Sequence, residues 1–295
     1  MNKLRVLDLF SGIGGFTLGL ERTGGFETVA FCEIEEFPRR VLAKHWPKVP
    51  CYHDVRELTA DKLAADGISV DVITGGFPCQ DISLAGKKAG MGEGTRSGLW
   101  SEIDRLIDEL RPQFVIVENV ANLLSGPSEQ PGGWFGRVLG DLAERGYNAE
   151  WQNIPAAAMG APHLRERAWI VAYPSKERQS EAGQFRRIEL AQWLPSRGEA
   201  VISADDRKER TKGCQPQQVS GFSAFSWCED VRRAEDLRGR SDLPTPLFRG
   251  GRDGIPHWVD RIGACGNAVI PQIPELIGHA ILEAIARKAE GEAAA

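Results

Sequence analysis

The sequence contains no long hydrophobic run, since no apolar stretch approaches the roughly 18 residues of a membrane-spanning helix. It also shows no signal-peptide pattern, because residues 1–5 lead directly into a strand pattern. We find no internal repeat. We therefore expect a globular cytoplasmic protein without membrane contacts. At 295 residues and 42% hydrophobic content, the chain can bury one substantial core and a small second domain.

Metal-binding and disulfide patterns are absent as well. The six cysteines form no Cys-x-x-Cys pair and have no histidine at metal-ligand spacing. Structural zinc sites and disulfide-rich secreted domains both need such patterns. We expect free thiols and no bound metal.

An overall positive charge, which many nucleic-acid-binding proteins carry, is missing, because the net charge is −5. The distribution is uneven, however. Residues 174–256 hold 15 Lys and Arg against 13 Asp and Glu, whereas the remainder holds 21 against 28. This slightly basic segment is either a recognition surface or an ordinary solvated face.

A glycine-rich turn follows the first expected strand, residues 4–10. The turn Asp8-Leu9-Phe10-Ser11-Gly12-Ile13-Gly14-Gly15 leads into a helix that ends near Arg22, and such turns let a ligand approach the backbone. Thr17 occupies the place of the third glycine of the dinucleotide fingerprint, which disfavours NAD. Glu33 follows the next strand, residues 27–31, and is either a ribose-binding carboxylate or a helix-start charge. The glycine-rich turn and Glu33 together have the spacing of one strand-helix-strand unit, and this combination favours an adenosine-type ligand.

Strand and helix patterns continue to alternate along the chain, which predicts a doubly wound α/β sheet. The further expected strands are residues 49–52, 70–74, 114–117 and 168–173, and the further expected helices are residues 35–45, 99–110 and 134–144.

A cysteine stands just beyond the strand at residues 70–74, in the stretch Gly-Gly-Phe-Pro-Cys-Gln-Asp-Ile-Ser. A free cysteine is usually a small core residue. Here Pro78 restricts the backbone before Cys79, and a polar, glycine-rich segment at residues 86–98 resembles a lid. Because the carboxyl edge of a parallel sheet carries ligands, Cys79 is a candidate nucleophile.

Three charged residues adjoin two other strands. Glu118 follows four apolar residues and is either a structural or a catalytic acid. Arg165 and Arg167 precede the strand at 168–173, and a spacing of two places side chains on the same side of an extended strand. They are either ligand-binding residues or members of surface salt bridges.

The periodic pattern stops after residue 173 and returns near residue 257. We predict a catalytic and cofactor-binding domain at 1–173, a small irregular domain at 174–256 and a C-terminal segment at 257–295 that returns to the first domain. That segment contains a helix whose apolar face must pack on the sheet domain. The face comprises Ile273, Leu276, Ile277, Ala280, Ile281, Ala284 and Ile285.

Five motifs in this order resemble the DNA (cytosine-5) methyltransferase family, as in bacterial or phage modification enzymes. They are Asp-x-Phe-x-Gly-x-Gly-Gly at 8–15, Gly-Phe-Pro-Cys-Gln at 76–80, Glu-Asn-Val at 118–120, Arg-x-Arg at 165–167 and Gly-Asn-Ala-Val-x-Pro at 266–271. The resemblance covers residues 7–173 and 263–278, and 174–256 corresponds by position to the target-recognition region. It implies the S-adenosylmethionine-dependent methyltransferase (Rossmann-like) fold.

The resemblance also implies a role for each matching residue. Cys79 would be the nucleophile that adds to C6 of a flipped cytosine, Glu118 the acid that binds the base, and Arg165 and Arg167 the positioning pair, with Arg165 able to stabilise charge at O2. The implied S-adenosylmethionine contacts are Phe10, Ser11, Gly12, Gly14, Glu33, Ile34, Asp54, Val55, Pro78, Asn267 and Ala268.

The implied substrate is duplex DNA with a specific sequence, modified by a monomer. A cognate restriction endonuclease is a candidate partner that the sequence does not specify. A tRNA cytosine-5 methyltransferase of the same fold would share nearly all the motifs, although the basic insertion suits duplex reading better. A catalytically dead relative would lack Cys79 or Glu118, and a nicotinamide oxidoreductase is disfavoured by Thr17.

Overall fold

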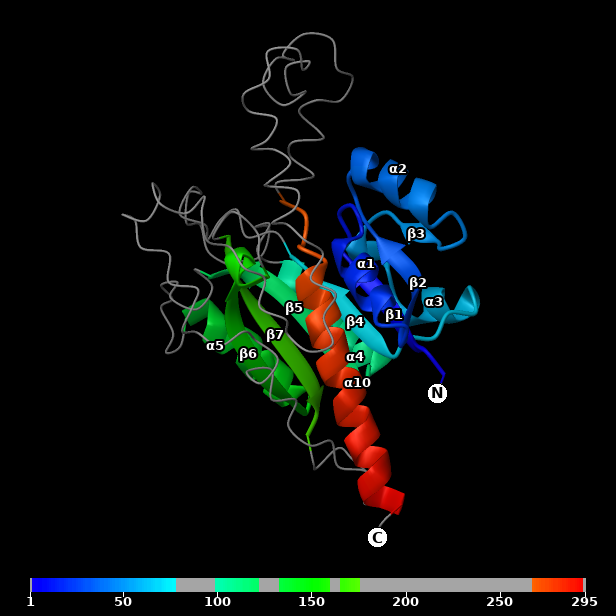
Figure 1. Ribbon diagram of the computed structural model, residues 1–295. Helices are drawn as coiled ribbons and strands as arrows, with labels where there is room; N and C mark the ends of the chain where they lie inside the picture. Colours follow the sequence, from blue (N-terminus) through cyan, green and yellow to red (C-terminus); the bar gives the residue numbers. More distant parts are fainter. Residues whose placement is uncertain (1, 78–98, 122–132, 160–164, 176–266, 294–295) are drawn as a thin grey trace, which may run out of the picture. The chain divides into compact units, whose positions relative to one another are not determined.

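The computed structural model describes residues 2–77, 99–121, 133–159, 165–175 and 267–293 (Figure 1). Most of them belong to one compact unit, and residues 155–159 and Arg165 belong to a second. Pro78, Cys79, the expected lid at 86–98 and nearly all of the expected recognition segment at 174–256 lie outside the described residues, so the predicted domain boundaries stay predictions.

One mixed sheet of seven strands forms the centre of the first unit, in the order β3-β2-β1-β4-β5-β7-β6. Neighbouring strands among the first five are parallel, and β7 is antiparallel to β5. The strands are β1 (Leu4–Leu9), β2 (Phe26–Cys32), β3 (Cys51–Tyr52), β4 (Val72–Gly75), β5 (Phe114–Val120), β6 (Tyr147–Pro155) and β7 (Glu166–Pro174).

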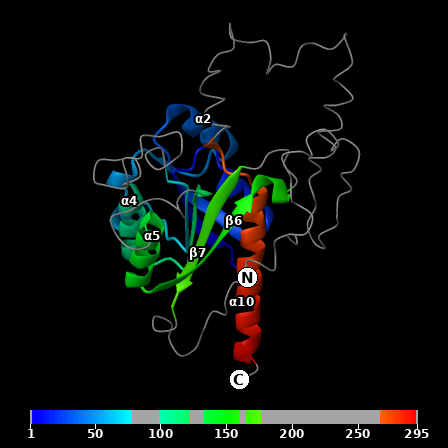
Figure 2. The ribbon, with the colours of Figure 1, turned by 90° about the vertical axis from the view of Figure 1, so that its left-hand side faces the viewer.

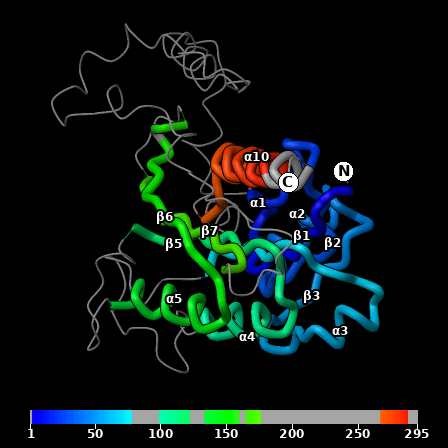
Figure 3. The backbone as a smooth tube through the Cα atoms, turned by 90° about the horizontal axis from the view of Figure 1, so that it is seen from below, coloured from blue at the N-terminus to red at the C-terminus, as the bar shows by residue number. Residues whose placement is uncertain are grey.

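The middle strands are apolar because helices cover both faces of the sheet. Val6, Leu7, Val72, Ile73 and Val115 are completely buried, as expected for parallel strands packed on both sides. Helices α1 and α10 cover one face, and α3, α4 and α5 cover the other (Figures 2 and 3). The helices are α1 (Gly15–Arg22), α2 (Glu36–His45), α3 (Ala60–Ala65), α4 (Trp100–Leu110), α5 (Gly133–Glu144) and α10 (Gln272–Ala293).

The predicted sheet fold is confirmed, together with the strands and helices expected in the described part of the chain. No clear sequence signal marks β6, whose residues are mostly half-buried or exposed. An edge strand of this kind has no continuous apolar run. No helix among the described residues has both the length and the hydropathy needed to cross a membrane.

The C-terminal helix packs on the sheet domain, as predicted, and the structure shows that its partner there is α1. The two helices approach closely at a glycine. A Cβ atom on Gly19 would clash with the carbonyl oxygen of Pro271 and would lie 2.9 Å from the Cβ of Pro274. The buried face of α10 matches six of the seven predicted positions: Ile273, Leu276, Ile277, Ala280, Ile281 and Ala284.

We predict that Gly19→Ala lowers the free energy of unfolding by about 1 to 3 kcal/mol, because the added methyl group overpacks the contact between α1 and α10. Gly140→Ala is the matched control, since Gly140 lies on an exposed face of α5 and a methyl group there would meet no atom within 4 Å. The control should gain roughly 0.5 to 1 kcal/mol from helix propensity. Equal stability of the two variants in urea unfolding would contradict the close contact.

Candidate active site

The register of the parallel strands aligns their carboxyl ends. Leu9 pairs with both Cys32 and Gly75, and Gly75 pairs with Val117. The residues that follow these four are Phe10, Glu33, Gly76 and Glu118. Four of the regions singled out in the sequence therefore begin beside one row across the sheet, which ends β1, β2 and β4, whereas β5 continues to Val120.

The turn after β1 is closed by a carboxylate from β2. Gly12 and Gly14 have φ angles of 53° and 86°, which favour glycine. The backbone N–H of Gly12 donates to Oε2 of Glu33 at 2.7 Å, and the N–H of Glu35 donates to Oε1 at 2.8 Å. Burial raises the pKa of Glu33, and these amide hydrogen bonds oppose that rise. The predicted residues Gly12 and Glu33 are thus in direct contact.

The other predicted cofactor residues of this region surround the same strand ends. The side chain of Ser11 donates to the carbonyl of Asp8, and Phe10 has a φ of 52°. Ile34 is 52% exposed, which is unusual for an isoleucine beside a buried strand. An exposed apolar side chain at a sheet edge can pack against a planar ligand.

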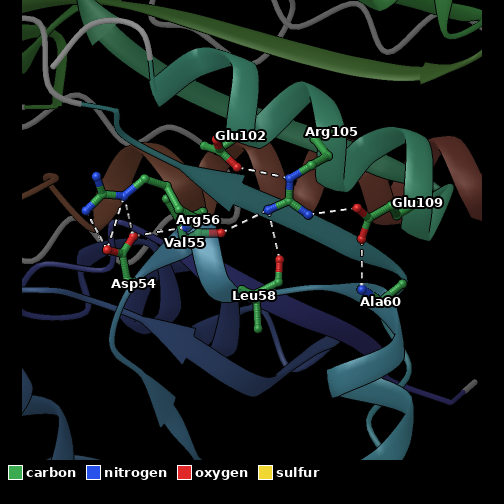
Figure 4. A network of polar contacts seen from close by, with 8 residues as sticks. All are labelled: Asp54, Val55, Arg56, Leu58, Ala60, Glu102, Arg105 and Glu109. Carbon is green, nitrogen blue, oxygen red and sulfur yellow. Dashed lines mark hydrogen bonds and ion pairs between the residues drawn. The ribbon is translucent and has the colours of Figure 1, made fainter. Parts of the chain in front are cut away.

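Asp54 and Val55 follow β3, which pairs with β2. The N–H of Glu33 donates to the carbonyl of Tyr52 at 3.0 Å, so the ends of these strands are joined. Asp54 caps the short 3-10 helix η1 (Val55–Glu57) by accepting from the N–H of Arg56. The Arg56 guanidinium also pairs with the carboxylate and lowers the pKa of Asp54 (Figure 4).

The described part of the C-terminal motif, residues 267–271, lies against the glycine turn that follows β1. A Cβ atom on Gly15 would clash with the carbonyl oxygen of Val269 and would lie 2.9 Å from the Cβ of that residue. Asn267 and Ala268, the predicted cofactor residues, directly precede Val269. Segments more than 250 positions apart in the sequence therefore meet where α1 begins.

Glu118 forms an ion pair with Arg167 across β5 and β7. The Nε of Arg167 lies 3.1 Å from Oε1 of Glu118, and the two side chains are 26% and 12% exposed. Glu118 is opposite Trp169 and Val120 is opposite Arg167. In an antiparallel pair this arrangement places Glu118 and Arg167 on the same face. The structure thus joins two of the four predicted catalytic residues.

The strand that leads to Cys79 also adjoins Glu118. A Cβ atom on Gly76 would lie 3.3 Å from Oε2 of Glu118, so a glycine lets this backbone come close to the carboxylate. The side-chain amide of Asn119 donates to the carbonyl of Phe77 at 3.3 Å. Phe77 stands two residues before Cys79, which itself lies outside the described residues together with Pro78.

Arg165 differs from the sequence-based expectation. Strand β7 begins at Glu166, and Arg165 has a φ of 20°, so Arg165 and Arg167 do not share an extended strand. The two arginines also belong to different units. The carbonyl of Arg165 accepts from the N–H of Ala156, which is in the same unit as Arg165. The expectation that a spacing of two places the pair on one side of a strand is therefore wrong.

A buried carboxyl near the end of β1 has no counterpart among the residues predicted from the sequence. Asp8 is completely buried and accepts hydrogen bonds of 2.8 Å from the hydroxyls of both Thr17 and Thr74. Thr28 donates to the Thr17 hydroxyl. Burial is the main cause that raises the pKa of Asp8 to about 7. Asp8 is the first residue of the motif at 8–15, but the sequence assigned it no role. Thr17 stands out only because it replaces a glycine of the dinucleotide fingerprint, so the sequence did not indicate that the two side chains are bonded.

Comparison with protein families agrees with these motifs. The family model of C-5 cytosine-specific DNA methylases matches residues 4–213, more than half of the chain. The chain belongs to this family.

Type II methyltransferase M.Sau3AI of Staphylococcus aureus is 36% identical over 192 residues, which are 62% of this chain and 46% of that protein. M2.BsuMI of Bacillus subtilis is 35% identical over 78% of this chain and 52% of its own length.

The matched region therefore spans about half the length of these curated relatives. Among solved structures, the S. pombe Dnmt2 methyltransferase has a TM-score of 0.55 at 17% identity, covering 96% of this chain and 99% of that one. The Entamoeba histolytica methyltransferase EhMeth has a TM-score of 0.57 at 14% identity, covering 97% and 99%. At such identities the two structures support the methylase fold. The described residues of our chain contain no cluster of metal-ligating side chains.

We predict that Asp8→Asn changes how stability depends on pH. In the folded protein Asp8 keeps its proton up to about pH 7, whereas its ordinary pKa is 3.8. Between these values the folded state binds more protons than the unfolded state, so the contribution of Asp8 to stability falls as the pH rises. From about pH 4 to about pH 8 the wild type should lose roughly 2 to 4 kcal/mol relative to the variant.

Chemical denaturation at several pH values measures this difference. Asp61→Asn, which makes the same substitution at an exposed carboxyl in α3, is the control for the chemical change itself. A difference between wild type and Asp8→Asn that does not vary with pH would refute the protonated, buried state of Asp8.

Proposed function

We propose that the chain is a DNA (cytosine-5) methyltransferase that uses S-adenosylmethionine to methylate C5 of a flipped cytosine within a specific duplex sequence. The observation that carries the proposal is the ion pair between Glu118 and Arg167. It lies beside Gly76, and Gly76 precedes Cys79 by three positions in the sequence. Family membership and the Type II methyltransferase names of the relatives favour DNA as the substrate.

The residues at the ends of β1, β2 and β3 fit S-adenosylmethionine. The Glu33 carboxylate is suited to bind ribose hydroxyls, the glycine turn allows close backbone approach, and exposed Ile34 offers an apolar surface for adenine. In the proposed site, Phe10, Ser11, Gly12, Gly14, Asp54, Val55, Pro78, Asn267 and Ala268 complete the contacts. When bound, the cofactor supplies an electrophilic methyl group on a sulfonium.

In the proposed mechanism the Cys79 thiolate adds to C6 of cytosine. Addition removes the aromaticity of the ring and makes C5 nucleophilic, and Cys79 is expelled when the C5 proton is lost after methyl transfer. Because C6 is inaccessible in a stacked duplex, the base must leave the helix at a cost of about a few kcal/mol. Residues 86–98, which lie outside the described residues, stay the sequence-based candidate for closure over the flipped base.

Glu118 would bind N3 and the exocyclic amine of the flipped base and so stabilise the charge that develops on the ring. Arg167 holds this carboxylate from β7, and the fixed geometry of a guanidinium limits its rotation. Arg165 remains the proposed donor to O2.

Labelled S-adenosylmethionine with either duplex DNA or tRNA tests the proposed substrate. We expect label in duplex DNA only. Label in tRNA alone would overturn the DNA assignment and favour the tRNA methyltransferase alternative. Label in neither substrate, from protein that binds the cofactor, would contradict the proposed activity.

We predict that Cys79→Ala abolishes methyl transfer but largely preserves binding of cofactor and duplex DNA, because the thiolate is required for the covalent step and adds little to recognition. Methyl transfer to DNA is measured in a turnover assay, and the binding of cofactor and of duplex DNA is measured separately by titration. Cys51→Ala changes another cysteine, a half-buried free thiol in β3, and serves as the control. Turnover of Cys79→Ala within about tenfold of wild type would be incompatible with the mechanism.

A further prediction is that sequence specificity resides in residues 174–256. This segment is slightly basic and contains interleaved aromatic residues, which suits reading of the major groove and phosphate contacts. Replacing it with the corresponding segment of a relative with a known target should change the methylated sequence and leave the modified atom unchanged. An active chimera that retains the original target would show that specificity lies elsewhere.

A further inference from the structure

Arg105 connects helix α4 to the segment after β3. Its Nη2 donates to the carbonyls of Val55 and Leu58, at 3.0 Å and 2.8 Å. These two carbonyls belong to η1 and to the residue that ends it, so one nitrogen binds both ends of the turn. Figure 4 shows the guanidinium reaching this turn from α4.

Two acids of α4 hold Arg105 in this orientation. Its Nε donates to Glu102 at 3.0 Å and its Nη1 to Glu109 at 2.7 Å. The second oxygen of Glu109 accepts from the backbone N–H of Ala60 at 2.9 Å, so the same network also holds the start of α3. A planar guanidinium can make these bonds in several directions at once, which a lysine ammonium on a flexible chain cannot reproduce.

The turn that Arg105 binds includes two proposed cofactor residues. Val55 is the first residue of η1, and Asp54 is its N-cap. The position of the Asp54 carboxylate is therefore set by the backbone of a turn only three residues long. Such a short turn has few hydrogen bonds of its own, and contacts to its carbonyls determine where it lies.

We propose that Arg105 is a positioning residue for the cofactor site, acting through the turn that carries Asp54 and Val55. The inference rests on the proposed function, because it assumes that these two residues bind S-adenosylmethionine. Arg105 makes no contact with the cofactor in this scheme. Its loss allows the turn to move, so cofactor affinity falls while the chemical step at saturating cofactor is retained.

The matched control is Arg145, which pairs with α4 from the end of α5. Arg145 binds Asp104 at 2.8 Å and Asp108 at 3.1 Å. Arg145→Lys therefore makes the same chemical change in an ionic network on the same helix. This control variant shows whether a loss of cofactor affinity comes from a general disturbance of α4 or from movement of the turn that carries Asp54 and Val55.

Isothermal titration with S-adenosylmethionine compares Arg105→Lys, Arg145→Lys and Asp54→Asn in the full chain. We expect Arg105→Lys and Asp54→Asn to raise the cofactor Kd about tenfold and Arg145→Lys to raise it less than about twofold. In turnover assays with duplex DNA, Arg105→Lys should raise the KM for cofactor in parallel and keep kcat within about twofold. Glu109→Gln, which retains an acceptor for Ala60, is a milder second variant and should raise the Kd in the same direction.

Three outcomes would overturn the inference. If Asp54→Asn weakens binding but Arg105→Lys and Glu109→Gln do not, the turn is not positioned by Arg105, and the cofactor site stands. If Arg105→Lys and Arg145→Lys weaken binding equally, the effect belongs to α4 as a whole. If Asp54→Asn leaves the cofactor Kd unchanged, as Arg105→Lys and Glu109→Gln then do too, the turn after β3 is not part of the cofactor site.

Discussion

The register of four neighbouring parallel strands is the constraint on which the site depends. Cys32, Leu9, Gly75 and Val117 occupy one row across the sheet, and each is followed by a turn or a residue with a proposed role. A shift of one residue between parallel strands would move every side chain of the shifted strand to the opposite face. Because the interiors of β1, β4 and β5 are buried on both faces, such a shift would also expose apolar side chains to solvent or bury polar ones.

The carboxylates near this edge are each held by donors of the protein itself. Glu33 accepts two backbone amides, Glu118 pairs with Arg167, and Asp8 accepts two threonine hydroxyls. A buried carboxyl without such partners would cost several kcal/mol. The three environments differ. Backbone amides hold Glu33, whose proposed task is to bind hydroxyls, and a guanidinium fixes the orientation of Glu118. Two hydroxyls bind Asp8, whose pKa burial raises to about 7.

The sequence was sufficient to predict the sheet fold, the approximate strand positions and the packing of the C-terminal helix on the sheet domain, because these follow from apolar periodicity and glycine turns. It also identified Glu33 and Glu118 as candidate residues of the site. It did not reveal β6, whose edge position leaves no apolar run, or the hydrogen-bond partners of Asp8, which come from separate elements. Arg165 was misplaced because alternation along a strand requires extended φ angles, and its φ is 20°. Arg105 was missed because its partners are backbone carbonyls about 50 positions away.

Bisulfite sequencing of DNA from cells that express the chain tests the central claim most directly, because it reports both the modified base and its sequence context. Our account predicts protected cytosines at one recurring short sequence, and none in cells that lack the chain. Complete conversion of every cytosine in cells that contain folded, cofactor-binding protein would contradict the assignment as a DNA cytosine-5 methyltransferase.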